Sequence, residues 1–173
     1  LEFEVFQAPF YTALGMDTPF DMAGDPTDST VVVAGYRAGF GLRLRRYDPD
    51  TKLVTSILDN NNVGTVGLGR HVTVSDDRII GVNTNNLILR VDPANPAAYQ
   101  SFAPPVGDVT GLTLDLDGNW LTTGAPSSSG EPRNLMSVDR DAGTFSTIVD
   151  LSSLFSWYVD VPAIATAPNE DVY

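Results

Sequence analysis

The only histidine in this 173-residue chain, His71, is the first candidate for chemistry. An imidazole that titrates near pH 7 can act as a general base or bind a metal ion. Its sequence neighbours form neither an Asp-His nor a His-His pair, and no Gly-x-Ser-x-Gly segment offers a serine nucleophile. The absence of cysteine excludes thiolate nucleophiles, thiolate zinc sites and disulfides. We therefore interpret His71 first as a packed or hydrogen-bonded residue and keep a catalytic role as the alternative.

Three polar residues, Asp115, Asp117 and Asn119, are spaced like the opening of a calcium-binding loop. An EF-hand loop has glycine at its sixth position and a bidentate glutamate at its twelfth, whereas here Gly118 is fourth and Pro126 is twelfth. Asp-Gly is also a strong hairpin-turn signal. The segment is therefore predicted to be a turn, with a calcium site as the weaker alternative and no other cofactor indicated.

Aromatic and arginine side chains outside the apolar runs are the candidates for ligand binding. Aromatic rings give a sugar or a peptide a large contact area at low entropic cost, and a guanidinium group can bind an anion. Packing between sheets is the favoured alternative for the aromatic residues. The predicted binding residues are Tyr11, Arg37, Phe40, Arg70, Trp157 and Tyr158.

Charge narrows the range of partners. The chain carries 22 acidic and 10 basic side chains, a formal net charge of −12. Nucleic-acid backbones and anionic membrane surfaces both attract basic faces, so neither is an expected partner. No apolar run approaches the roughly 18 residues that a membrane-spanning helix needs, so no membrane insertion is expected. A hydrophobic content of 42% nevertheless suits a folded core.

The elements that must position these residues are short strands. Apolar, β-branched runs end at Gly, Pro, Asn and Asp, and no segment sustains helical periodicity over three turns. Asp48, Asp92 and Asp139 follow one another at spacings of 44 and 47 residues, and each lies between two apolar runs. Aspartate at such a position caps a hairpin turn by accepting hydrogen bonds from backbone N–H groups. The chain is therefore predicted to be all-β and to repeat.

A second series of turns runs in parallel with the first. Asp28, Asp76, Asp117 and Asn169 each stand three residues before a strand, at spacings of 48, 41 and 52 residues. Two turns in each period make a unit of four antiparallel strands and about 45 residues. All six aspartates of the two series are interpreted as turn residues.

This unit resembles the blade of a β-propeller, and the pattern from Leu135 to Ile148 is similar to secreted bacterial propellers and to the NHL, gluconolactonase-like and quinoprotein-like groups. The resemblance implies a single, partial propeller domain over residues 1–173, with about three and a half blades. Because closed propellers have typically 4–8 blades, closure would need the remainder of the polypeptide or another copy. The expected blades are 19–58, 69–102 and 109–149, with partial blades at 1–6 and 158–173.

The resemblance also implies where a ligand would bind. The loops between the second and third strands, and the connections between blades, share the face that usually carries ligands in propellers. His71 would begin an inner strand near the axis. Lactonase-type propellers bind calcium there with Glu, Asn and Asp, but no glutamate of this chain begins an inner strand. Asn83 is interpreted as a loop residue, and Arg43, Arg45 and Arg46 are expected to be solvated or to pair with aspartates of a neighbouring blade.

These observations lead to two main functional hypotheses. The first is a non-catalytic binding or structural module of a secreted or cell-surface protein, with a protein or carbohydrate ligand on that loop face. The alternative is a metal-dependent hydrolase or lyase of the gluconolactonase-like kind that uses His71. An intracellular scaffold also stays open, because the lack of cysteine fits either side of a membrane. Fold alone does not choose among them.

Overall fold

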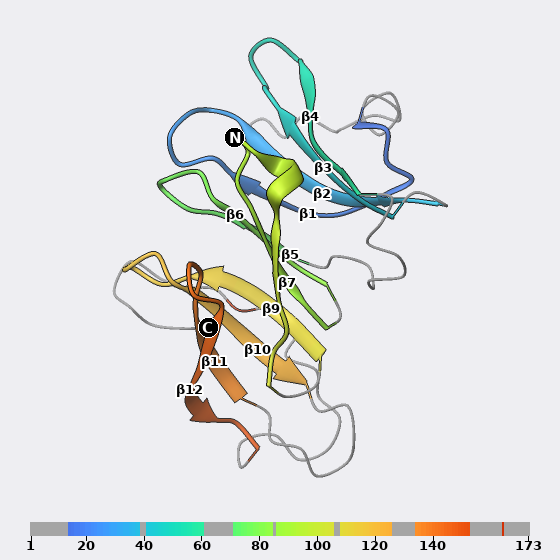
Figure 1. The fold of residues 1–173 in the computed structure, drawn as a ribbon. Coiled ribbons are helices and arrows are strands. Elements are labelled where there is room, and N and C mark those ends of the chain that lie inside the picture. The colour runs from blue at the N-terminus through green and yellow to red at the C-terminus, as the bar shows by residue number, and fades with distance from the viewer. Residues whose placement is uncertain are drawn as a thin grey trace.

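The computed structural model describes residues 14–38, 41–60, 71–84, 86–105, 108–125, 134–152 and Ile164. Within these residues the chain forms twelve strands and one short 3₁₀ helix, so the all-β prediction is confirmed. The strands make three separate four-stranded sheets, which follow one another from blue to orange in Figure 1. No helix among the described residues has the length and apolar character needed to cross a membrane.

Each sheet is antiparallel and runs in chain order from its first strand to its fourth. We call the sheets blades 1, 2 and 3. The 3₁₀ helix η1, Pro96–Ala98, lies between the last two strands of blade 2. Blade 1 contains β1 (Thr18–Gly24), β2 (Val31–Arg37), β3 (Gly41–Tyr47) and β4 (Val54–Asn60). Blade 2 contains β5 (His71–Val74), β6 (Ile80–Asn83), β7 (Ile88–Val91) and β8 (Gln100–Phe102). Blade 3 contains β9 (Asp108–Leu114), β10 (Trp120–Ala125), β11 (Asn134–Asp139) and β12 (Thr144–Asp150).

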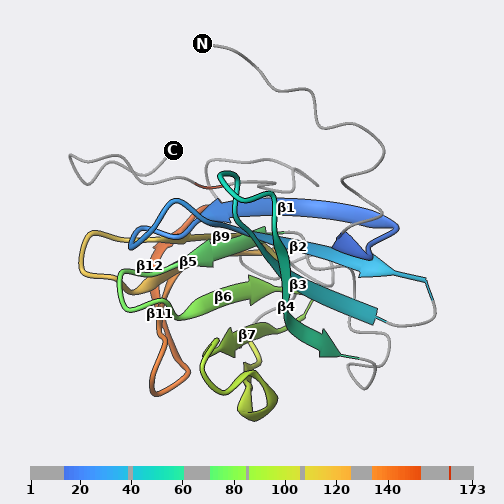
Figure 2. The ribbon, with the colours of Figure 1, turned by 90° about the horizontal axis from the view of Figure 1, so that it is seen from above.

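The first strands of the three blades lie side by side on the inner edge of the array. Strand β1 contacts β5, and β5 contacts β9, whereas the fourth strand of each blade lies outermost. Figure 2 shows the blades stacked with their sheets facing one another, without forming a closed ring. The predicted partial blades at 1–6 and 158–173 fall outside the described residues, apart from Ile164.

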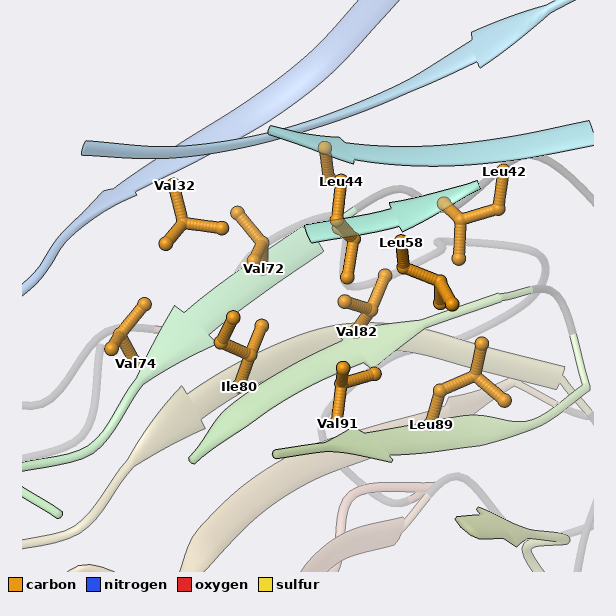
Figure 3. Packing of buried hydrophobic residues seen from close by; sticks show 11 residues of the cluster. Val32, Leu42, Leu44, Leu58, Val72, Val74, Ile80, Val82, Leu89 and Val91 are labelled. Carbon is orange, nitrogen blue, oxygen red and sulfur yellow. The ribbon is translucent and has the colours of Figure 1, made fainter. Parts of the chain in front are cut away.

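Aliphatic side chains fill the space between blades 1 and 2, which we call seam 1–2. Strand β3 contributes Leu42 and Leu44, and blade 2 contributes Ile80, Val82 and Leu89. All five side chains are nearly inaccessible to water. Figure 3 shows these side chains pointing toward one another from the two sheets. Each fully buried aliphatic side chain contributes roughly 1.5–3 kcal/mol, so this seam holds the two sheets together.

Seam 2–3, between blades 2 and 3, is built around one large side chain. Trp120 is fully buried and packs with Ile79, Ile88 and Val138. A β-carbon added at Gly81 would lie 2.8 Å from Cε2 of Trp120. Glycine inside a strand often marks such a close approach, and here it makes room for the indole.

The turns between the first and second strands and between the third and fourth strands of each blade gather at one end of the array, which we call the turn end. In the turns before the fourth strand, the predicted aspartates do cap: Asp48 accepts from the N–H groups of Asp50 and Thr51, and Asp139 does so from its own turn. Asp92 accepts from Ala94 in the same way. The hydroxyl of Thr51 and the backbone N–H groups lower the pKa of Asp48 below its usual value, and the N–H groups of Ala142 and Asp141 do the same for Asp139.

In the connections between the first two strands, all three aspartates lie in the turn region as predicted, but only one of them caps its turn. Asp28 accepts a hydrogen bond from the N–H of Thr30. The other two turns are instead held by the neighbouring carboxylates, since Asp77 accepts from Ser75 and Asp115 accepts from Asn119. A turn aspartate works through its distance from the N–H groups it caps, and a count of three residues before the strand does not capture that distance.

Arginines at the turn end connect the blades. Across seam 1–2, Arg78 pairs with the buried carboxylate of Asp25 at 3.0 Å and also with Asp28. Across seam 2–3, Arg140 holds both carboxylate oxygens of Asp77 at 2.7 Å. Several of the aspartates in the turns therefore either cap a turn or form an ion pair between blades.

Candidate functional site

The end of the array opposite the turn end, where the inner strands begin, holds the only histidine of the sequence. His71 is the first residue of β5, as predicted for an inner strand. We call this the entry end. In the neighbouring strand β1 the register shifts between Pro19 and Asp21, which leaves Phe20 as a bulge. A bulge changes the direction of the side chains that follow it, and Asp21 lies within reach of β5.

Asp21 and His71 form a pair between blades 1 and 2. Oδ2 of Asp21 lies 3.6 Å from Nδ1 of His71 and accepts the backbone N–H of Val72 at 3.0 Å. Partial burial opposes ionisation of Asp21, but the adjacent imidazole and the N–H groups of Val72 and Met22 outweigh it, so its pKa lies below the usual value. A carboxylate beside an imidazole orients the ring.

Asn83 holds the same histidine from the other side. Its Oδ1 accepts the backbone N–H of His71 at 2.6 Å, and its Nδ2 donates to the carbonyl of Val109 at 3.4 Å. The residue is fully buried and is the last of β6, so our interpretation of Asn83 as a loop residue is wrong. Asn83 and Asp21 together connect the first strands of all three blades around His71.

The pair has the composition of a proton-handling group. The side chain of His71 is 21% exposed and that of Asp21 is 34% exposed, so a ligand can reach both. With Nδ1 directed toward the carboxylate, Nε2 makes no hydrogen bond to any described residue. It can therefore donate to or accept from a bound molecule, or take up a proton from one.

The sequence did not reveal Asp21 or the role of Asn83. Asp21 lies 50 positions before His71, inside a strand, and only the stacking of β1 on β5 brings the two together. Asp21 could have been found as the single charged residue in the run Pro19-Phe20-Asp21-Met22-Ala23. A carboxylate in a strand of a packed sheet needs a hydrogen-bonding or charged partner.

Of the predicted binding residues, the structure describes only Arg37. It is the exposed last residue of β2 and therefore lies at the entry end, where it has interactions of its own. Nothing among the described contacts brings it to His71. The others, Tyr11, Phe40, Arg70, Trp157 and Tyr158, lie outside the described residues.

The remaining arginines differ from their predicted role. Arg43 and Arg45 are buried, and both contact Asp59 of the same blade, at 3.1 and 2.6 Å. Arg46 pairs with Asp25, also of blade 1. The expectation of solvated arginines or of partners in a neighbouring blade is therefore wrong for these contacts, because blade 1 itself brings each arginine close to an aspartate.

The oxygen atoms of both calcium candidates already take part in hydrogen bonds. At the entry end, Oδ2 of Asp21 and Oδ1 of Asn83 already accept backbone N–H groups. In the other candidate, both carboxylate oxygens of Asp115 accept hydrogen bonds from Asn119. No three carboxylate or imidazole groups gather in metal-binding geometry within the described residues.

Comparison with known proteins identifies the fold. No protein-family model and no curated protein sequence matches the chain. Solved structures do match: apo AztD from Citrobacter koseri is 14% identical with a TM-score of 0.58, over 89% of this chain and 40% of AztD. Virginiamycin B lyase from Staphylococcus aureus is 13% identical with a TM-score of 0.60, over 90% and 47% of the two chains. The extracellular domain of the two-component system BT3049 from B. thetaiotaomicron is 14% identical with a TM-score of 0.63, over 99% and 22%.

These matches confirm the predicted β-propeller fold, since the chain aligns with propellers over most of its length. The chain spans less than half the length of each of these three proteins. At such low sequence identity the likeness shows the fold alone. The finer resemblance to NHL or gluconolactonase-like propellers stays a prediction.

Proposed function

We propose that the chain is part of a binding propeller of a secreted or cell-surface protein, and that the entry end receives a protein or carbohydrate ligand. One observation carries this proposal: the partly exposed imidazole of His71, oriented by Asp21, has a ring nitrogen that bonds no described residue. At the turn end, by contrast, Asp25 pairs with Arg78 across seam 1–2, and Asp77 pairs with Arg140 across seam 2–3. The matched extracellular domain of BT3049 supports a location outside the cell.

A second candidate function is an enzyme that uses His71 as a general base. The contact with Asp21 favours it, since a carboxylate that orients an imidazole is a recurring arrangement in acid–base catalysis. One of the matched propellers is a lyase, which supports the same class. Stoichiometric calcium in the purified protein would favour a metal-dependent form of this candidate over a binding module.

The single histidine makes the proposal directly testable. In protein labelled with ¹³C and ¹⁵N in histidine only, every imidazole signal belongs to His71. We expect one member of a panel of neutral oligosaccharides, uronic-acid oligosaccharides and short peptides to shift that signal saturably. The variants His71→Gln and Asp21→Asn should weaken the binding of that compound.

Asp92→Asn provides the control, because Asp92 caps a turn at the opposite end of the array. This variant should bind as the unchanged chain does. Chemical conversion of the bound compound would support the enzyme. Binding that leaves the His71 signal unmoved, or that Asp92→Asn abolishes instead, would contradict the proposed site.

A further inference from the structure

The hydrogen-bonding polarity of the His71 site follows from its partner Asp21. The pKa of Asp21 lies below the usual value, so its carboxylate is ionised at neutral pH and can only accept hydrogen bonds. Its Oδ2 lies 3.6 Å from Nδ1 of His71. A lone pair on Nδ1 would face an oxygen that also offers only lone pairs, whereas an N–H at Nδ1 is attracted to it. In the neutral ring, the proton therefore belongs on Nδ1.

The main chain on both sides of this contact is fixed. Successive N–H groups of a strand point to opposite edges, and here each is taken by a side-chain oxygen. The N–H of His71 donates to Asn83 at 2.6 Å, and the N–H of Val72 donates to Asp21 at 3.0 Å. Asn83 is fully buried and is itself bonded to the carbonyl of Val109. His71 cannot move its main chain away from the carboxylate without breaking one of these hydrogen bonds.

A proton on Nδ1 leaves a lone pair on Nε2, the ring nitrogen that bonds no described residue. The Asp21 side chain is 34% exposed, and each carboxylate oxygen has two lone pairs, so it can accept further hydrogen bonds as well. The two side chains therefore present acceptors and no donor. A ligand that satisfies both of them has to supply the hydrogen atoms.

Charge favours the same kind of ligand. A ligand carboxylate would gain nothing from the lone pair of Nε2, and it would lie beside the like charge of Asp21. The net charge of −12 adds repulsion at longer range. A hydroxyl group carries no charge and donates one hydrogen bond.

The spacing of the acceptors favours two donors over one. Nε2 lies across the ring from Nδ1, so it is farther from Oδ2 of Asp21 than the 3.6 Å that separates Oδ2 from Nδ1. Two neighbouring hydroxyl groups, as on a sugar ring, can each meet one acceptor. A single ammonium nitrogen would have to reach both acceptors at once.

We propose that His71 and Asp21 form an acceptor-only site that selects a neutral oligosaccharide over the same oligosaccharide with a carboxylate. This inference rests on the proposed function, because it takes the entry end as the place where a ligand binds. It narrows that function to one class of ligand, and it assigns a defined protonation state to the ring of His71.

The protonation state is measured first, without a ligand. In protein labelled with ¹⁵N in histidine only, both ring signals belong to His71, and protonated and unprotonated ring nitrogens give separate signals. At pH 7 and above we expect a protonated Nδ1 and an unprotonated Nε2. In Asp21→Asn the new amide can donate to Nδ1, so part of the population should carry the proton on Nε2. A proton on Nε2 in the unchanged chain, in the neutral or the doubly protonated ring, would overturn the proposal.

Ligand selection is measured next by calorimetry. The probes are glucose tetrasaccharides of several linkages, their glucuronic acid counterparts and a lysine-rich peptide. We expect the best neutral probe to bind at least about tenfold more tightly than its uronic counterpart, also at 0.5 M salt, where repulsion from distant charges is screened. This ratio should approach one in Asp21→Asn and stay unchanged in Asp92→Asn, which removes one carboxylate at the turn end.

The outcomes separate this inference from the proposed function. A uronic probe or the peptide that shifts the His71 signal and binds as tightly as the best neutral probe would overturn the acceptor-only site while leaving a binding site at the entry end. A probe that binds without moving the His71 signal would contradict the proposed function instead. If no probe binds, the proton position alone decides whether the site is acceptor-only.

Discussion

The two seams of the array solve the same packing problem in different ways. Seam 1–2 spreads its contacts over eleven buried aliphatic residues from six strands of blades 1 and 2. Seam 2–3 depends on Trp120, fitted against Gly81 and tilted against Phe102 at a centroid distance of 6.3 Å. The ion pairs differ as well: Asp25 in seam 1–2 is buried, whereas Asp77 in seam 2–3 is half exposed.

The difference teaches where each seam is vulnerable. A seam made of many similar aliphatic side chains can repack around a small change in one of them. A seam centred on one indole that packs over one glycine has less of this freedom, because a change at either residue removes the fit between them. We therefore expect seam 2–3 to be the more brittle one in its core, and seam 1–2 to depend more on its buried charge.

The largest effect is expected from Trp120→Ala. Removing a fully buried indole loses its transfer free energy and leaves a cavity, at a cost of about 3–5 kcal/mol in the free energy of unfolding. Urea denaturation measures this cost. Leu44→Met in seam 1–2 is the control and should cost less than about 1.5 kcal/mol. Similar costs for the two variants would contradict the contrast between the seams.

Asp25→Asn is expected to come next, at about 1.5–3 kcal/mol, because a buried carboxylate loses its charge toward Arg78 and Arg46. Burial opposes ionisation of Asp25, but hydrogen bonds from Thr27 and the nearby Arg78 outweigh it and lower its pKa. A lowered pKa gives stability that is present above the unfolded-state value and lost as the pH falls through the folded-state value.

The pH dependence supplies the second measurement for this residue. The unchanged chain should therefore lose stability below about pH 4, and the difference between it and Asp25→Asn should shrink there. A difference that stays constant from pH 7 to pH 3 would show that the charge of Asp25 is not the cause.

Gly81→Ala should destabilise the chain by about 1–3 kcal/mol through overpacking, since the added methyl group would meet the Trp120 ring and Thr73. Combining it with Trp120→Phe sharpens the test, because the smaller ring gives the methyl group room. In a double-mutant cycle the two changes should then cost less together than the sum of their separate costs. If the two costs simply add, the packing at Gly81 and the packing at Trp120 are independent of each other.

The smallest effect is expected from Arg140→Ala, at less than about 1 kcal/mol, because its partner Asp77 is half exposed and water screens the pair. The loss should shrink further in molar salt. The corresponding loss for Asp25→Asn should change little with salt, because Asp25 is buried. This part of the comparison would be contradicted if salt changed the loss of stability of Asp25→Asn and left that of Arg140→Ala unchanged.

The sequence predicted the sheets well because turn chemistry is local. Asp48, Asp92 and Asp139 cap the turns that their spacing assigned to them. Gly81 also carried a readable signal, since a glycine within the run Ile79-Ile80-Gly81-Val82 suggests a close approach. What the run could not show was the identity of the approaching residue, because Trp120 comes from the next blade.

The candidate site was harder to predict because its contacts are not local. Asp21 reaches His71 through a bulge in β1 and the stacking of two blades, and neither follows from the spacing of residues. Arg45 illustrates the same limit, since its contacts with Asp59 and with the carbonyl of Leu14 depend on strand register and on the path of the chain before β1. The residue types indicated which chemistry was possible, but only the fold showed which residues contact one another.

The outermost strands have a consequence for solubility. Strands β4, β8 and β12 each leave one edge without a partner strand among the described residues. Such edges invite pairing between molecules, which leads to aggregation. Here β4 and β12 are interrupted by register shifts at the matching places, beside Ile57 and Ile148, and β8 is only three residues long. A partner strand would find no long, regular edge to extend, so these three edges are poor templates for pairing between molecules.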